Sequence, residues 1–231
     1  KGELEQWQEF ISKPLTGQSR IVTSLCIAFA GALLKPLSID GGGFHIVGKS
    51  SIGKSISLKV ASTVWGKPSE YVKTWNMTKN AAEGAAAMHN DGFLALDEIS
   101  QADKRDVGQL SYLYANGDGK GRGKASGGNR VTEKWRVIFL SNGEETLKAL
   151  MAQANQKTNA GMEVRLCHID GDAGNGMGIF DSLAIAETPE EQAQKITDLT
   201  DKYYGTAGIK WLQYITDNKS DVIKSANKFM N

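Results

Sequence analysis

Residues 48–55, with the sequence GKSSIGKS, constrain the fold of this 231-residue chain more than any other stretch. They match the pattern G-x-x-x-x-G-K-[ST], in which glycines let successive backbone N–H groups curl around a polyphosphate. The apolar residues 44–47 predict a short buried strand before the loop, and residues 56–65 predict a helix after it. The N-terminus of that helix would add positive charge to the loop. The pattern therefore predicts a phosphate-binding loop, and the alternative is a glycine-rich turn that binds nothing.

The side chains of this loop have different predicted roles. Lys54 would reach the β- and γ-phosphates of ATP, and the Ser55 hydroxyl would hold Mg²⁺. The whole loop is predicted to contact the nucleotide: Gly48, Lys49, Ser50, Ser51, Ile52, Gly53, Lys54 and Ser55.

An apolar run that ends in two carboxylates, residues 93–98, supports this interpretation. Such a run is typical of a strand buried on both faces of a parallel sheet, and ligands of these sheets bind at the carboxyl ends of the strands. Neighbouring residues on an extended chain point in opposite directions, so the two acids should differ in role. Asp97 suits the coordination of Mg²⁺, and Glu98 suits the activation of a water for attack on the γ-phosphate.

Composition and charge limit the expected partners and location of the protein. The net charge of +1 gives no attraction of the whole surface to nucleic acid, so such binding requires a local basic patch. The two cysteines predict buried thiols of a reducing compartment rather than disulfides, which favours a cytoplasmic location. The longest apolar run, residues 25–34, is about half of a membrane span, and no membrane partner is expected. Because the chain opens at Lys1 and its first methionine is Met77, we expect a piece of a longer protein.

Strands and helices alternate along the chain, which predicts an α/β fold with a doubly wound, mostly parallel sheet of five strands. Two helices in residues 1–38 would pack on a core of residues 39–181, and residues 182–231 would form a small helical lid. The helical signal begins at Pro189 and breaks at Gly205. The expected strands are residues 44–47, 71–75, 93–98, 135–140 and 164–169.

The order of these motifs resembles AAA+ ATPases of the P-loop NTPase class. The similarity is closer to the domain-of-unknown-function family 927 of phage and mobile-element replication proteins, whose members look like relatives of MCM-type replicative helicases. It extends from about residue 20 to residue 181. The segments that carry it, besides the loop, are Val64-Trp65-Gly66, His89-Asn90-Asp91-Gly92, Leu96-Asp97-Glu98, Ala115-Asn116-Gly117-Asp118-Gly119-Lys120-Gly121-Arg122 and Ser141-Asn142-Gly143-Glu144.

The resemblance implies further site residues. Asn142, after the fourth strand, matches the sensor that hydrogen-bonds the γ-phosphate or the attacking water; the alternative is a turn asparagine. Arg165 matches the arginine that reaches a neighbouring subunit's ATP site, where a guanidinium stabilises the transferring phosphoryl group; the alternative is a structural arginine. Lys54 and Glu98 would complete the catalytic set. The chain departs from its relatives because no arginine follows Arg165. A lysine substitutes for that second sensor (Lys195, Lys202 or Lys210), or the function is absent or lies outside this sequence.

Residues 116–136 form the most basic segment of the chain. MCM-like proteins carry a hairpin at this position that projects into the ring's channel, so the segment is the expected contact with nucleic acid. Its glycines allow close approach to phosphates, and its cations supply salt-sensitive attraction. The alternatives are a solvated loop and, for Lys120 and Arg122, contact with the nucleotide. The predicted contacts are Lys120, Arg122, Lys124 and Arg130.

Together these features predict the ATP-hydrolysing motor domain of a replicative or mobile-element DNA helicase. It would act on single-stranded or forked DNA as a ring, expected to be a hexamer, because a finger in trans needs a neighbour to receive it. ATP and Mg²⁺ would be its cofactors. A second hypothesis is an ATP-switched replication initiator or assembly factor that unwinds nothing. A P-loop kinase fits less well, because Glu98 directly after Asp97 suits water activation.

Overall fold

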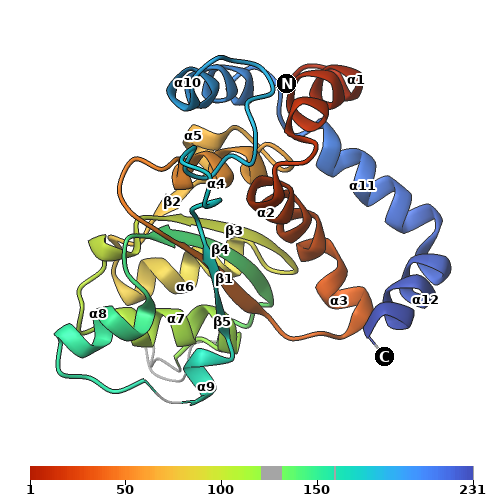
Figure 1. The fold of residues 1–231 in the computed structure, drawn as a ribbon. Helices are drawn as coiled ribbons and strands as arrows, with labels where there is room; N and C mark the ends of the chain where they lie inside the picture. The colour runs from red at the N-terminus through yellow and green to blue at the C-terminus, as the bar shows by residue number, and fades with distance from the viewer. Residues whose placement is uncertain (121–131, 159, 231) are drawn as a thin grey trace.

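A parallel sheet of five strands forms the centre of the computed structural model, which describes residues 1–120, 132–158 and 160–230 (Figure 1). The strand order is β2-β3-β4-β1-β5, and every neighbouring pair is parallel. The five-stranded α/β prediction is therefore confirmed. The strands are β1 (Gly42–Val47), β2 (Lys73–Thr74), β3 (Gly92–Asp97), β4 (Val137–Gly143) and β5 (Leu166–Asp170).

The register of the sheet brings the ends of its central strands level. Ile46 of β1 lies beside Asn142 of β4, and Leu96 of β3 lies beside Ser141. Because the strands are parallel, the segments that follow β1, β3 and β4 emerge at one edge of the sheet, where α/β proteins bind ligands. We call this edge, which carries Gly48, Asp97 and Asn142, the carboxyl edge.

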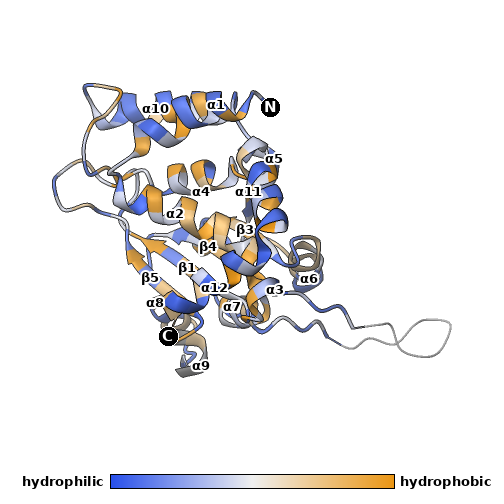
Figure 2. Cartoon of the chain, turned by 90° about the vertical axis from the view of Figure 1, so that its right-hand side faces the viewer, coloured by the Kyte–Doolittle hydropathy of each residue, from blue (hydrophilic) through white to orange (hydrophobic). Residues whose placement is uncertain are grey.

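Helices cover both faces of the sheet. Helices α2 and α4 pack on β3 and β4 from one side, and α7 packs on β1 and β4 from the other, flanked by α6 and α8. Alternate residues of β3 enter the two cores: Phe93 and Ala95 face α4, whereas Leu94 and Leu96 face α7. The hydrophobic residues are concentrated in the sheet and in the helices against it (Figure 2). The helices of this part are α1 (Leu4–Trp7), α2 (Ser19–Ala30), α3 (Leu34–Leu37), α4 (Lys54–Ser62), α5 (Pro68–Tyr71), α6 (Lys79–Met88), α7 (Val107–Asn116), α8 (Leu147–Gln153) and α9 (Ala160–Glu163), with the π-helix η1 (Gln8–Ser12) and the 3-10 turns η2 (Lys13–Leu15), η3 (Gly31–Leu33) and η4 (Ile99–Gln101).

The C-terminal helices pack against the N-terminal ones and against α4. They are α10 (Pro189–Thr200), α11 (Thr206–Asp217) and α12 (Lys219–Met230). Helix α10 contacts α4, α11 contacts α1, and α12 contacts α3. Gly205 breaks the helical run, as its sequence predicts, since its φ of +84° is one that glycine adopts without strain. Trp211 ties α11 to α2 through a hydrogen bond of 3.0 Å from its Nε1 to the Phe29 carbonyl.

Two predictions of detail are wrong: the burial of the two cysteines and the start of α7. Both cysteines are exposed: Cys26 lies on the outer side of α2, and Cys167 lies on the edge strand β5. The apolar run 25–34 belongs to a longer helical stretch, Ser19–Leu37, which could cross a membrane by length and composition alone; here it packs against α4 and the sheet. Helix α7 begins at Val107 rather than near residue 102, because Asp103 caps a turn by accepting the Arg105 N–H at 2.9 Å.

Candidate functional site

The loop of residues 48–55 joins β1 to α4 at the carboxyl edge. Gly53 caps α4 with φ of +94°, and a Cβ there would lie 2.8 Å from Ile179. A Cβ on Gly48 would overlap the Ile52 side chain. Gly48 N–H also donates to the Gly143 carbonyl at 3.1 Å, which fastens the loop to the end of β4. The positive φ of Gly53 therefore requires glycine there, whereas a side chain at Gly48 would require Ile52 to move.

Lys54 is the first residue of α4, and its side chain folds back into the loop. Its Nζ donates to the Gly48 carbonyl at 2.9 Å and to the Lys49 carbonyl at 2.6 Å, and the residue is only 7% exposed. The ammonium thus lies inside the curl of backbone where the motif predicts a phosphate. A bound phosphate would exchange these carbonyl contacts for charged ones, which are stronger.

Three polar side chains from α4, β3 and β4 meet beside the loop. Ser55 Oγ donates to Asp97 Oδ1 at 3.1 Å, and Asn142 Nδ2 lies 2.8 Å from the same carboxylate oxygen and 3.1 Å from Ser55 Oγ. The arrangement brings together Lys54, Ser55, Asp97 and Asn142, four residues that the sequence predicts for one site.

Glu98 occupies an unusual backbone conformation at this point. Its φ of 56° lies in the left-handed region, which costs a non-glycine residue about 1–3 kcal/mol. Its N–H donates to Asn142 Oδ1 at 2.6 Å, and its carboxylate accepts from Ser100 Oγ at 2.6 Å. The carboxylates of Asp97 and Glu98 therefore have different partners, as expected from their adjacent positions, while Asn142 also bonds to the Glu98 backbone.

Arg165 lies away from this cluster. It immediately precedes β5, and its carbonyl accepts from Gly43 N–H at 2.8 Å near the start of β1. The five residues from Gly43 to Gly48 place it roughly 17 Å from the loop, at about 3.3 Å per residue. Its guanidinium donates to the Gly161 carbonyl at 3.0 Å and lies 5.5 Å from the centre of the Tyr112 ring. Arg165 cannot serve the site of its own chain.

The basic segment 116–136 is described only at its two ends. Residues Asp118 and Lys134 form an antiparallel bridge and an ion pair of 3.5 Å, so the two arms of the segment run side by side. Lys120 follows α7 near the amino-terminal edge of the sheet, where its N–H lies 3.4 Å from Glu83 Oε1. It is therefore remote from the nucleotide loop of its own chain. Three predicted DNA contacts, Arg122, Lys124 and Arg130, lie outside the described residues.

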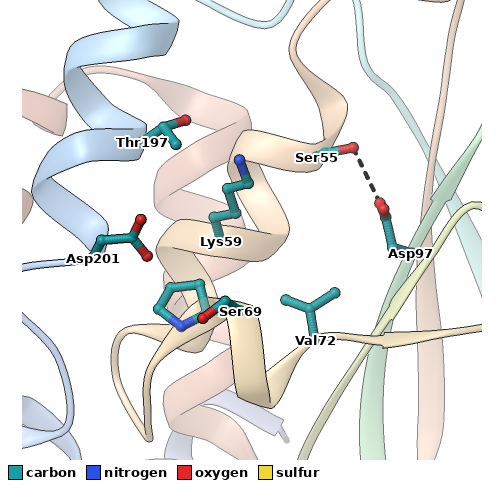
Figure 3. Close-up of a pocket in the computed structure, with 8 residues that line it drawn as sticks. Ser55, Lys59, Ser69, Val72, Asp97, Thr197 and Asp201 are labelled. Carbon is teal, nitrogen blue, oxygen red and sulfur yellow. Dashed lines mark hydrogen bonds between the residues drawn. The ribbon is translucent and has the colours of Figure 1, made fainter.

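A cavity of about 260 Å³ adjoins the Ser55–Asp97 pair and reaches the C-terminal helices (Figure 3). Lys59, which sequence reasoning missed, lines it together with Thr197 and Asp201 of the α10 region. Its one signal is its spacing, because a residue four positions after Ser55 lies on the same helix face. The lysines proposed to replace the missing arginine lie elsewhere: Lys195 donates to the Ile185 carbonyl at 2.9 Å, Lys210 lines a separate groove with Trp211, and Lys202 is exposed.

A buried series of hydrogen bonds lies next to Asn142 at the carboxyl edge. Trp75 Nε1 donates to Ser141 Oγ at 2.8 Å, and Ser141 Oγ lies 3.0 Å from His45 Nδ1. His45 Nε2 lies 3.0 Å from the Glu145 carbonyl, which can only accept. The neutral Nε2–H tautomer is therefore the one that satisfies every group. These hydrogen bonds hold the side chain of Ser141, the neighbour of Asn142, in place. None of them requires a protonated His45.

Burial lowers the pKa of His45 to about 4 from 6.5, partly opposed by the hydrogen bond to the Glu145 carbonyl. The unfolded chain binds this proton below pH 6.5 and the folded chain only near pH 4, so stability rises with pH across that window. The His45 contribution is thus fully present above pH 6.5 and is lost as pH falls toward 4. We expect the free energy of unfolding to fall by about 2 kcal/mol from this residue between pH 7 and pH 5.

Urea unfolding of wild type and His45→Gln at pH 7, 6 and 5 measures this effect. His45→Gln should be less stable at pH 7 but should lose about 2 kcal/mol less on acidification. His89→Gln is the matched control, since burial also lowers the pKa of His89. This variant should keep the part of the pH dependence of stability that comes from His45. Parallel pH profiles for wild type and His45→Gln would contradict the assignment.

With the geometry established, comparison with known proteins places the chain. The family described as a domain of unknown function, DUF927, matches residues 1–134, more than half of the 231 residues. The chain belongs to the DUF927 family. The match covers the loop, Asp97 and Glu98, and it ends before Asn142 and Arg165. No curated protein matches this DUF927 chain.

A solved structure of another protein shares the fold of this DUF927 chain. SCCmec type IV Cch, described as an active helicase, is 22% identical with a TM-score of 0.70. The match covers 97% of this chain and 39% of that protein, so this chain spans less than half of the helicase's length. NtrX from Brucella abortus in complex with ATP is 12% identical with a TM-score of 0.35, over 65% of this chain and 35% of NtrX, which is too low a similarity to carry an argument.

Proposed function

We propose that this domain binds and hydrolyses ATP with Mg²⁺ and is the AAA+ P-loop motor of a DNA helicase. The observation that carries the proposal is the meeting of Lys54, Ser55, Asp97 and Asn142 at the carboxyl edge, beside the N-terminus of α4. The fold shared with a protein described as an active helicase supports it.

The donor set of the site fits Mg²⁺. Ser55 Oγ and Asp97 Oδ1 are oxygen ligands 3.1 Å apart, and Mg²⁺ in phosphate sites uses one or two protein oxygens with substrate phosphates and waters. Within residues 1–120, 132–158 and 160–230, no group of three or more His, Cys, Asp or Glu could form an all-protein cage. When bound, Mg²⁺ would neutralise charge on the phosphates. Ser55 and Asp97 are the residues that would hold it.

The other side chains would divide the chemistry among them. The Lys54 ammonium would donate to phosphate oxygens and stabilise their developing charge. The Glu98 carboxylate would accept the proton of the attacking water, and the Asn142 amide would orient that water or the γ-phosphate. The hydrogen bond from Glu98 N–H to Asn142 Oδ1 links the two residues, so a movement of the Asn142 side chain would shift the backbone of Glu98.

Arg165 would complete the site of a neighbouring subunit. It lies at the opposite edge of the sheet from its own loop, which suits an arginine finger used in trans in a ring, expected to be a hexamer. The paired arms of segment 116–136 lie at that same edge, where they would reach single-stranded or forked DNA. A cytoplasmic location and a place in mobile-element replication belong to the same proposal. The second hypothesis, an ATP-switched initiator or assembly factor, shares the site and lacks strand separation.

Single-stranded DNA should stimulate phosphate release, and a forked duplex should be separated in an ATP-dependent reaction. Neutralising Lys120, Lys124 and Arg130 should weaken DNA binding without regard to sequence. On single strands, each lost contact should flatten the slope of log K against log salt by about 0.7. Basal ATPase should survive, because Lys54, Asp97 and Glu98 are untouched. The matched control neutralises three exposed lysines of α12, which makes the same change in charge. It should alter neither DNA binding nor basal ATPase. The lysines are Lys219, Lys224 and Lys228.

Stimulation without strand separation would favour the initiator. Unchanged affinity and salt slope in the segment variant would move the DNA contact elsewhere. A loss of basal ATPase in that variant would place part of the segment at a nucleotide site.

A further inference from the structure

The cavity beside Ser55 and Asp97 contains a cation with no partner in the described structure. Lys59 is half-buried on α4, and within residues 1–120, 132–158 and 160–230 its ammonium makes no hydrogen bond and no ion pair. An ammonium that lines a cavity without a bonded partner is free to bind an anion there. Such a group is expected to have an anionic partner in the working state of the protein.

The position of Lys59 indicates which anion that is. It follows Ser55 by four residues, about 6 Å along the helix, and side chains of a helix lean toward its N-terminus. Figure 3 shows the Lys59 side chain extending toward the first turn of α4, on the side of Ser55. Ser55 and Asp97 line the same cavity and are the residues that would hold Mg²⁺. If Ser55 and Asp97 hold Mg²⁺ between the β- and γ-phosphates, the terminal phosphate of ATP would lie in the part of the cavity that they line.

We propose that Lys59 is a nucleotide-binding residue that contacts the terminal phosphate of ATP and so favours the triphosphate over ADP. This inference rests on the proposed nucleotide site. It also answers the lack of any arginine after Arg165, because α4 itself would supply the second phosphate cation. Thr197 and Asp201 close the cavity from the α10 region, so binding at Lys59 would also reach the C-terminal helices.

Asp201 is the competing partner, because its carboxylate lines the same cavity. In Figure 3 it lies on the far side of Lys59 from Ser55. If Lys59 only joined α4 to α10 through Asp201, its loss would affect both nucleotides alike. If Lys59 contacts the terminal phosphate, its loss would affect the triphosphate alone.

The test measures the dissociation constants of Mg²⁺-ADP and of a non-hydrolysable β,γ-imido analogue of ATP by calorimetry. Lys59→Met should weaken the analogue about 10- to 100-fold, the range of a hydrogen bond to a charged group, and ADP by less than about 3-fold. Lys59→Arg keeps the cation and should stay within about 5-fold of wild type for both. Asp201→Asn should leave the preference for the analogue intact. Lys195→Met is the matched control, since that ammonium is bonded to the Ile185 carbonyl.

Equal weakening of both nucleotides by Lys59→Met, or no weakening of either, would overturn the role of Lys59 while leaving the nucleotide site standing. The same holds if Asp201→Asn reproduces the Lys59→Met result. Failure of wild-type protein to bind either nucleotide would overturn the proposed function and this inference together.

Discussion

Glu98→Gln should bind ATP with near wild-type affinity and hydrolyse it at least about 100-fold more slowly. The substitution keeps the size of the side chain and its ability to accept from Ser100 Oγ, and it removes the basicity that a water-activating carboxylate needs. The backbone hydrogen bond to Asn142 is untouched, so the geometry of the cluster should persist. Nucleotide titration and steady-state phosphate release on the same preparation separate the two effects.

Glu5→Gln provides the matched control for that experiment. Glu5 is exposed on α1, away from the carboxyl edge, and its amide variant should hydrolyse ATP at the wild-type rate. Full hydrolysis by Glu98→Gln would remove Glu98 from the chemistry. Loss of binding would indicate instead that the left-handed backbone at residue 98 depends on the carboxylate.

Arg165→Ala should retain ATP binding and lose hydrolysis by up to the roughly 10³- to 10⁵-fold that an arginine finger contributes in well-studied cases. Its distance from the loop of its own chain is the reason that binding should survive. Mixed with Glu98→Gln protein, Arg165→Ala protein should regain part of the activity. Each single variant lacks one half of every interface, whereas a mixed ring contains interfaces with an intact Glu98 on one side and an intact Arg165 on the other.

Two controls make the mixing experiment decisive. Arg105→Ala removes an exposed arginine that is paired with Asp103, and this variant should hydrolyse ATP normally. Differently tagged subunits must be shown to co-assemble before the mixed activity is interpreted. If mixed rings form and no activity returns, Arg165 is not a finger in trans and has a structural role, such as its contact with Tyr112.

Local patterns explain why much of the fold could be predicted. The loop of residues 48–55 is contiguous in sequence, so the spacing of its glycines and its lysine predicts the conformation of the loop. The run before Asp97 is apolar because alternate residues enter two cores, and this double burial is visible in the sequence. The break at Gly205 follows from the same kind of local chemistry.

What the sequence did not predict depends on contacts between distant segments. The cavity at Lys59 is closed by Thr197 and Asp201, which lie far along the chain and line it only because α10 packs on α4. The left-handed backbone of Glu98 donates a hydrogen bond to Asn142, which is supplied by a different strand. The exposure of Cys26 and Cys167 follows from which side of α2 is covered and from the place of β5 at the edge of the sheet. The apolar residues around each cysteine in the sequence indicate neither which side of α2 is covered nor where β5 lies in the sheet.

The most direct measurement for the central claim is a titration of Mg²⁺-ATP into wild-type protein and into Lys54→Ala, with phosphate release followed on both. The Lys54 side chain lies inside the curl of the loop, with its ammonium 2.9 Å and 2.6 Å from the Gly48 and Lys49 carbonyls. The account predicts saturable binding and turnover by wild type, and loss of both in Lys54→Ala at unchanged thermal stability. Equal binding and turnover by the two proteins, or no binding by the wild type, would contradict it.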